Sequence, residues 1–188
     1  MIDYLYIILL TLPVSLVAFN TAFWAGVYKC LCISEVVMVA LAFMLFQAGM
    51  LFLGSWSGGS FANSMGWMAI PFAEAIILLT GVKVIYSSIR IRPEQKSYDL
   101  SKYGELIAVS FASSLNAFMI GLGIGLLREV SQEAIAILAT VVGLFTIAGA
   151  YYGKKSGKIM LVRISGVVAG ILVILLGVFT ALHLYDVI

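Results

Sequence analysis

The sequence predicts an all-α integral membrane protein in which six transmembrane helices form two inverted three-helix repeats. Of its 188 residues, 63% are hydrophobic and 11% are charged, whereas soluble domains carry about 25% charged residues. Six apolar segments are each long enough to cross about 30 Å of hydrocarbon as a helix. A short segment, SLVAF at Ser15 to Phe19, recurs 99 residues later as SLNAF at Ser114 to Phe118. Composition, segment length and repeat therefore agree on this fold class.

The six predicted helices follow one another with short connections. The first has no basic residues ahead of it and an apolar run that is too long for a signal peptide. An even number of spans places both ends of the chain on one side of the membrane. We place the helices over residues 4–28, 33–54, 67–89, 104–127, 133–153 and 161–184.

Two segments predict where the chain turns or divides. The Gly/Ser-rich stretch 54–60 is typical of a tight turn, which we place between the second and third helices on the outer side. The stretch 90–103 contains Pro93 and is the one polar linker. The chain therefore divides into a first repeat over 1–89, a cytoplasmic linker over 90–103 and a second repeat over 104–188.

Basic residues gather at one face of the predicted bundle. Ten of the eleven Lys and Arg residues fall there, and only Arg128 falls on the opposite face. Because loops rich in Lys and Arg stay in the cytoplasm, we expect the basic face to be cytoplasmic and both termini to lie outside a cell membrane. The ten are Lys29, Lys83, Arg90, Arg92, Lys96, Lys102, Lys154, Lys155, Lys158 and Arg163.

Glu74 is the one carboxylate placed clearly inside a predicted span. A charge at the centre of a membrane helix costs about 2.5–3.5 kcal/mol on insertion scales. Lys83 follows nine residues later on the same helix, about 13 Å away at 1.5 Å per residue, which is too far to pair. Glu74 is therefore either a cation ligand or proton carrier, or a hydrogen-bonded acid facing inward near the outer mouth.

Asn116 lies near the middle of the fourth predicted helix, and its counterpart in the repeat is Val17 in the first. Asn20 lies one turn beyond Val17 on the same helix face, so that it could reach a site that Val17 cannot serve. Amides inside a membrane also form ordinary hydrogen bonds between helices, worth roughly 0.6–2 kcal/mol. Clustering on equivalent helices favours a substrate or metal site.

Gln47 extends this set to the second helix, where it lies seven residues from the outer end of its predicted span. Glu74 is seven residues from the outer start of the third. If these two helices form a hairpin, Gln47 and Glu74 lie at similar depth and can meet. Thr146 is the predicted counterpart of Gln47 in the second repeat, and it completes the candidate site.

Pro13 and Pro71 lie within the first and third predicted helices. Each removes a helical hydrogen bond, and this leaves the carbonyl groups of Leu9 and Trp67 without their helical donors. Interrupted helices with free carbonyl groups are one way in which transporters build ion sites. The prolines therefore add two candidate ligands to the amides.

Enzymatic chemistry has little support in the sequence. It contains no glycine-rich phosphate loop ending in Lys-Ser/Thr, no His-Glu metalloprotease helix, and a single histidine, His183. Cys30 and Cys32 fall at the cytoplasmic end of the first helix, where thiols stay reduced, and one Cys-x-Cys pair is weak evidence for a metal. We expect no enzyme, no cofactor and no nucleic-acid partner, and we leave a homodimer open. The principal partner would be the lipid bilayer.

Several segments resemble the MntP-type putative manganese efflux pumps, which belong to the lysine-exporter superfamily. The repeated motif is VSLVAF at 14–19 and SSLNAFMIGLG at 113–123, and LTGVKVIY at 79–86 fits the third helix of the pattern. Gly54, Trp56 and Gly58 fit the second. The resemblance covers nearly the whole chain. It implies six spans in two inverted repeats, outward termini and export of Mn²⁺.

Three carboxylates of that family pattern are missing here. The family carries Asp in each copy of the motif, where this chain has Val17 and Asn116, and Gln47 stands where the family has Glu on the second helix. Mn²⁺ is a hard cation that prefers carboxylate, carbonyl and water oxygens, so a site made of amides and carbonyls would bind it weakly. Glu74 would return one negative charge at a shifted place.

Three functions remain open on the sequence alone. The first is export of a divalent cation, most simply Mn²⁺, by alternating access, with Asn116, Gln47, Glu74 and Asn20 along the path. The second is transport of another small solute such as an amino acid, because amides suit uncharged hydrogen-bonding groups. The third is a membrane protein that has lost transport along with its motif carboxylates.

Overall fold

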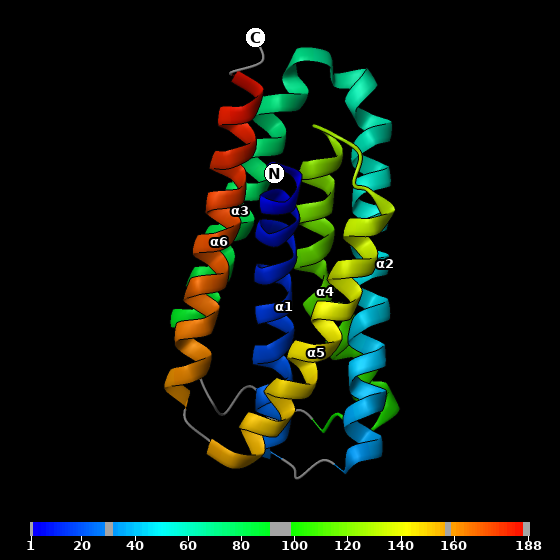
Figure 1. The fold of residues 1–188 in the computed structure, drawn as a ribbon, viewed down its shortest axis with the longest axis vertical. Helices are drawn as coiled ribbons and strands as arrows, with labels where there is room; N and C mark the ends of the chain where they lie inside the picture. The colour runs from blue at the N-terminus through cyan, green and yellow to red at the C-terminus, as the bar shows by residue number, and fades with distance from the viewer. Residues whose placement is uncertain (1, 29–31, 91–98, 157–158, 186–188) are drawn as a thin grey trace.

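The computed structural model describes residues 2–28, 32–90, 99–156 and 159–185, which form one bundle of long helices (Figure 1). All six α-helices in these ranges are long and apolar enough to cross a membrane, which confirms the predicted all-α membrane architecture. A short 3-10 helix, η1 (Gly66–Met68), precedes the third. The α-helices are α1 (Ile2–Tyr28), α2 (Ile33–Met65), α3 (Ala69–Ile89), α4 (Tyr103–Gly125), α5 (Gln132–Ser156) and α6 (Ile159–Tyr185).

The predicted turn at residues 54–60 is wrong, because α2 continues as helix to Met65. The chain reverses instead at Gly66, whose φ of 53° lies where glycine alone is unstrained. Gly54 stays helical because it packs directly on the backbone of α4. A Cβ atom on Gly54 would lie 2.3 Å from the carbonyl oxygen of Phe118. The glycine therefore permits close helix approach and does not mark a loop.

The predicted helix breaks at the two prolines are also absent. α1 runs without interruption through Pro13. Pro71 falls in the first turn of α3, which begins at Ala69. Proline is tolerated there because the first backbone N–H groups of a helix have no helical acceptor in any case. Proline has no backbone N–H group at either position, so neither residue can donate to the carbonyl group four residues earlier, that of Leu9 or of Trp67. What the structure lacks is the interruption of the helix.

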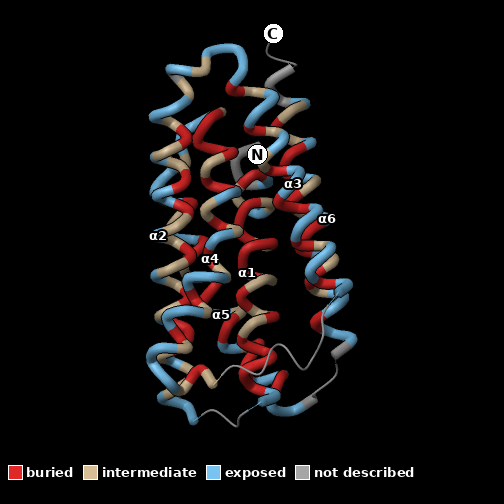
Figure 2. Tube along the Cα trace, turned by 180° about the vertical axis from the view of Figure 1, so that it is seen from behind, coloured by how far each residue is buried: buried red, intermediate tan, exposed pale blue. Residues whose placement is uncertain are grey.

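Each helix packs chiefly on a helix from the other half of the chain. α1 lies along α5, α2 along α4, and α3 along α6, while α2–α5, α1–α6 and α3–α4 form the secondary contacts. Buried residues line the facing sides of these helices (Figure 2). The two halves of the sequence therefore interleave, and helices of the same half touch one another little.

The close contact between α2 and α4 has a counterpart between α5 and α1. A Cβ atom on Gly54 would lie 2.3 Å from the carbonyl oxygen of Phe118, and one on Gly149 would lie 2.4 Å from that of Phe19. Phe19 and Phe118 are equivalent residues of the recurring segments. The same point of the repeat is thus used twice, once in each half.

The two contacts suggest a second offset between α2 and α5. Gly54 and Gly149 differ by 95 residues, whereas Phe19 and Phe118 differ by 99. An offset of 95 residues aligns Gln47 with Val142, and an offset of 99 aligns it with Thr146. The pairing of Gln47 with Thr146 therefore stays a prediction.

The contact between α3 and α6 pairs two glycines with each other. A Cβ atom on Gly170 would lie 2.8 Å from the Gly81 carbonyl oxygen, and one on Gly81 would lie 3.0 Å from the Gly170 carbonyl oxygen. Each of these glycines therefore lets the other helix approach closely, as Gly54 does for α4 and Gly149 does for α1.

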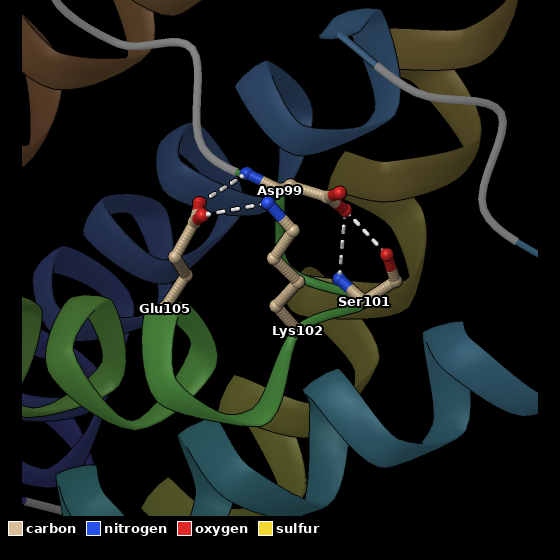
Figure 3. A network of polar contacts seen from close by, with 4 residues as sticks. All are labelled: Asp99, Ser101, Lys102 and Glu105. Atoms are coloured by element: carbon tan, nitrogen blue, oxygen red, sulfur yellow. Dashed lines mark hydrogen bonds and ion pairs between the residues drawn. The ribbon is translucent and has the colours of Figure 1, made fainter.

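Four polar residues fix the start of α4 (Figure 3). The Glu105 carboxylate accepts the backbone N–H of Asp99 at 2.8 Å and lies 3.5 Å from the Lys102 ammonium. Asp99 in turn accepts the backbone N–H of Ser101 at 3.2 Å and its hydroxyl. Leu100, between them, is fully buried. The described end of the predicted linker is thus tied to α4 and to the core.

The two ends of the bundle differ in charge. α1 begins and α6 ends where α2 turns into α3, and we call this the termini end (Figure 1). Arg128 lies there, with its guanidinium 4.3 Å from the centre of the Tyr6 ring. We call the opposite end the basic end, and its side of the membrane remains a prediction. Lys29, Arg92, Lys96 and Lys158 lie outside the described residues. The described basic residues at the basic end are Arg90, Lys102, Lys154, Lys155 and Arg163.

Candidate substrate-binding site

A cavity of about 420 Å³ lies between α1 and α4, with α3 along one side. We call it the central cavity. It reaches from the middle of α1 and α4 toward the basic end, because its wall runs from Asn116 back to Ala108 on α4 and on to Ser87 near the end of α3. Its lining residues are Val17, Thr21, Ser87, Ala108, Val109, Ala112, Ser113 and Asn116.

Val17 and Asn116, the two equivalent positions of the recurring motif, line this same cavity. α1 and α4 make few direct contacts with each other, and the space between them is where the two motif copies come together. Thr21, one turn after Val17, adds a hydroxyl that donates to the Val17 carbonyl oxygen at 3.1 Å. The two copies of the recurring motif thus line one cavity.

Gln47 lies directly behind the cavity wall. Its side chain is 1% exposed, and its Nε2 atom donates to the Ser113 hydroxyl at 3.4 Å. Its Oε1 atom is buried and has no hydrogen-bond partner among the described residues. Because Ser113 lines the cavity, this hydrogen bond connects Gln47 to the cavity wall.

Lys83 lies inside α3, six residues before the helix ends at Ile89, as the predicted third span over 67–89 places it. Its ammonium group donates to the Asn116 Oδ1 atom at 3.2 Å. A positive charge therefore stands at the motif position of the fourth helix, where the family pattern has a carboxylate.

Glu74 is separate from the central cavity, so the expected meeting with Gln47 does not occur. α4 packs against both α2 and α3, and it separates the two residues. Gln47 contacts α4 at Ser113, whereas Ala73, next to Glu74, packs on Gly123. Those two points are ten residues apart on α4, about 15 Å at 1.5 Å per residue. The Glu74 Oε1 atom is buried and lacks a hydrogen-bond partner in the described structure.

Asn20 and Thr146 face other helices. The Asn20 Oδ1 atom accepts the Ser165 hydroxyl of α6 at 2.5 Å, and the side chain is 8% exposed. Thr146 is fully buried and donates to the Val142 carbonyl oxygen of its own helix at 2.7 Å. Neither residue is part of the cavity wall, and both act here as hydrogen-bonding partners inside the bundle.

An apolar layer closes the cavity toward the termini end. Beyond Val17 and Asn116, α1 and α4 contribute side chains with almost no exposure to a single core cluster. A separate cavity of about 670 Å³ lies at the termini end between α2 and the start of α5, and includes Glu129, but none of the predicted site residues. The closing residues are Leu10, Val14, Ala117, Ile120 and Ile124.

The central cavity offers neutral oxygens and one ammonium group. Asn116, Ser113 and Thr21 supply amide and hydroxyl oxygens on its wall, and none of the described residues that line it carries a carboxylate. Across the described residues there is no group of three or more His, Cys, Asp and Glu side chains that could hold a metal ion. The described thiol, Cys32, is exposed and lies before α2, where its backbone N–H donates to Glu35 at 2.8 Å. Cys30 lies outside the described residues.

Sequence reasoning missed four residues of this site: Thr21, Lys83, Ser87 and Ser113. Two of them carried a usable signal. Thr21 lies four residues after Val17, hence on the same helix face, and Ser113 belongs to the quoted motif itself. Lys83 was placed on the third helix but was counted only among the charges of the basic face. The contact of Ser87 with the cavity depends on how α3 packs against α4, which no local pattern reports.

Comparison with known proteins gives consistent results. A family model described as "Mntp: Putative manganese efflux pump" matches residues 30–180. A protein of Methanothermobacter thermautotrophicus named "Putative manganese efflux pump MntP" is 30% identical over 138 residues, covering 73% of each chain.

Two further proteins show the same similarity. One from Dehalococcoides mccartyi with the same name is 31% identical over 74% of this chain and 72% of its own. "Putative manganese efflux pump MntP 2" of Clostridium botulinum is 26% identical over 94% of this chain and 92% of its own. No solved structure matches the chain.

Proposed function

Because this chain belongs to the MntP family of putative manganese efflux pumps, we propose that it exports Mn²⁺ across the cell membrane and loads it in the central cavity. One observation carries the proposal: both copies of the recurring motif, at Val17 and Asn116, line that cavity. A cation reaching them would stand near the membrane centre, where transporter sites of repeated folds lie.

The cavity chemistry allows weak and reversible cation binding. Mn²⁺ accepts carbonyl, hydroxyl and water oxygens as well as carboxylates. Asn116 and Ser113 offer such oxygens on the wall, and the Gln47 Oε1 atom is a buried acceptor without a partner behind it. Each of these ligands is neutral, so we expect a Kd well above that of a site with the family's acids.

The packing supports alternating access with moving units that differ from the sequence halves. α1 is held to α5, and α2 to α4, by contacts in which a glycine meets the opposite backbone. α1 and α4, on either side of the cavity, touch each other little. We therefore assign the movement to the α1–α5 pair against the α2–α4 pair, so that the cavity closes at the basic end while the apolar layer opens.

The pattern of helix contacts supports two inverted repeats. Exchange of the halves converts the α1–α5 contact into the α4–α2 contact and the α1–α6 contact into α4–α3, and it leaves α2–α5 and α3–α6 unchanged. Because each half has three spans, equivalent helices run in opposite directions across the membrane. Such a relation lets the structure open to one side by the same change that closes it to the other.

Export is tested directly by transport. In a host without its own Mn²⁺ exporter, the chain should restore growth in excess Mn²⁺, and inside-out vesicles should take up the ion. Asn116→Ala should abolish both, because it removes the amide at the shared motif position, while Asn20→Ala, outside the cavity wall, should retain transport. Failure of the unaltered protein to move Mn²⁺ in either assay would refute the proposal.

Accessibility tests which side the cavity faces. In a background with Cys30 and Cys32 replaced by serine, Thr21→Cys should react with a membrane-impermeant maleimide in inside-out vesicles and not in right-side-out vesicles. Thr146→Cys, at a fully buried position, should react in neither. Labelling of Thr21→Cys from the outside alone would contradict both the predicted topology and an inward-open cavity.

A second candidate function is favoured by the absence of carboxylates from the cavity wall. Amide and hydroxyl groups suit an uncharged or zwitterionic solute such as an amino acid as well as they suit a cation. A thermal-shift screen of Mn²⁺ beside a panel of amino acids separates the two functions. Stabilisation by metal alone would exclude the solute, and stabilisation by amino acids alone would exclude the cation.

A further inference from the structure

Lys83 is a charged side chain within a membrane-spanning helix, and its hydrogen bond is with a neutral group. Its Nζ atom lies 3.2 Å from Asn116 Oδ1. Among the described residues, no carboxylate lies within ion-pair distance of it. Ionisable residues in membrane spans usually pair with one another or line a path for ions. Lys83 is therefore not held in the span by an ion pair with a described carboxylate.

The direction of the side chain follows from the direction of its helix. α3 runs from the termini end to the basic end (Figure 1), and side chains of an α-helix lean toward its N-terminus. The Lys83 stem therefore leans away from the nearby basic end and toward the middle of the bundle. A lysine that only needed water would reach for the basic end, whereas this one reaches the wall of the central cavity at Asn116.

The position of the ammonium group overlaps with that of a cargo cation. Asn116 Oδ1 is a carbonyl oxygen at the shared motif site, and a cation bound there would use the lone pairs that Lys83 now occupies. Two cations at hydrogen-bond distance from this one oxygen would lie within a few ångströms of each other and repel each other. Occupation by Lys83 and by a free cation therefore exclude each other.

We propose that the Lys83 ammonium group is a tethered cation that occupies the Asn116 position in the empty protein and that the transported cation must displace it. The inference rests on the proposed cation export. Lys83 is exposed, and its four-carbon stem is flexible, so that the ammonium group can swing toward the basic end when cargo arrives. Lys83 thus limits the affinity of the central cavity for cations, and it selects the cations that bind oxygen ligands strongly.

Calorimetry of the purified full chain with MnCl₂ tests this role. Lys83→Gln removes the competing charge and should lower the Kd for Mn²⁺ by about tenfold or more. Lys83→Met keeps the apolar stem without adding an amide, and it should lower the Kd for Mn²⁺ by a similar factor. This variant separates the loss of the charge from any effect of the new amide group in Lys83→Gln. Lys83→Arg keeps a cation that can reach Asn116 and should bind Mn²⁺ no more tightly than the unaltered protein.

Lys154→Gln is the matched control, because it removes the same charge at the exposed end of α5. It should leave the Kd unchanged. The gain from Lys83→Gln should persist at 0.5 M KCl, since salt screens the field of exposed charges far more than direct competition inside the cavity. The gain should also disappear when Asn116→Ala is added, because no oxygen remains to compete for.

Three outcomes overturn the inference. Lys83→Gln could bind Mn²⁺ no more tightly than the unaltered protein, or Lys154→Gln could gain as much Mn²⁺ affinity as Lys83→Gln. The third outcome is that the gain in Mn²⁺ affinity from Lys83→Gln persists when Asn116→Ala is added. These results are independent of the transport assay. Absence of Mn²⁺ movement by the unaltered protein refutes the proposed export, and unchanged binding in Lys83→Gln refutes displacement even if export is real. Melting curves of each variant verify that it is folded.

Discussion

Aspartate at both Val17 and Asn116 should raise the affinity of the central cavity for Mn²⁺ by about a hundredfold or more. Both positions line one cavity, so that two carboxylates placed there face a common space. Carboxylates are the preferred ligands of this hard cation, and each tenfold gain in affinity corresponds to about 1.4 kcal/mol. Calorimetry with MnCl₂ on the double variant and on the unaltered protein measures the difference.

The matched control adds the same two charges elsewhere. Ser131→Asp with Gln132→Glu places both acids at the separate cavity of the termini end, and it should change the Mn²⁺ affinity little. An equal gain in this control would mean that net charge alone attracts the ion. No gain in the cavity variant would mean that Val17 and Asn116 do not face a shared cation position, and the assignment of the site would fail.

Gly54→Ala should destabilise the protein strongly, although it adds a single methyl group. The new Cβ atom would lie 2.3 Å from the Phe118 carbonyl oxygen and 2.9 Å from the Leu122 nitrogen. Both are backbone atoms of α4, which cannot rotate away as a side chain would. We expect a loss of about 1–3 kcal/mol, the usual cost of overpacking, and more if α2 and α4 separate.

Gly49→Ala is the control for this change, because it lies on the same helix and its Cβ atom would meet nothing within 4 Å. Alanine there should leave stability unchanged or raise it slightly, since alanine is the better helix former. Thermal unfolding in detergent, followed by the loss of the monodisperse peak in size-exclusion chromatography, compares the two. Equal melting of both variants would contradict the close contact of α2 with α4.

The helices were predictable because the membrane imposes their length and composition. Apolar segments of this length with few charges predict membrane spans without any knowledge of the helices they pack against, and each of the six predicted spans coincides with one long helix. The end of α2 was not, because Gly and Ser between residues 54 and 60 are typical of a turn. Their real environment is the backbone of α4, and a contact between distant segments leaves no local signal.

The site was predictable only where the repeat carried the information. Val17 and Asn116 lie together because equivalent positions of two related halves meet between α1 and α4. Gln47 and Glu74 were expected to meet because consecutive helices often form hairpins, but α4 packs against both α2 and α3. The contact of Lys83 with Asn116 depends on that same placement of α4.

The interleaved packing has a consequence for how the protein is made. The main partner of α1 is α5, that of α2 is α4, and that of α3 is α6, so that a nascent chain ending after α3 has no core to form. We therefore expect the first three helices to insert into the bilayer individually and to lack their main packing partners until the second three are synthesised. Co-expression of residues 1–98 with residues 99–188 as separate chains should therefore rescue each of them from proteolysis.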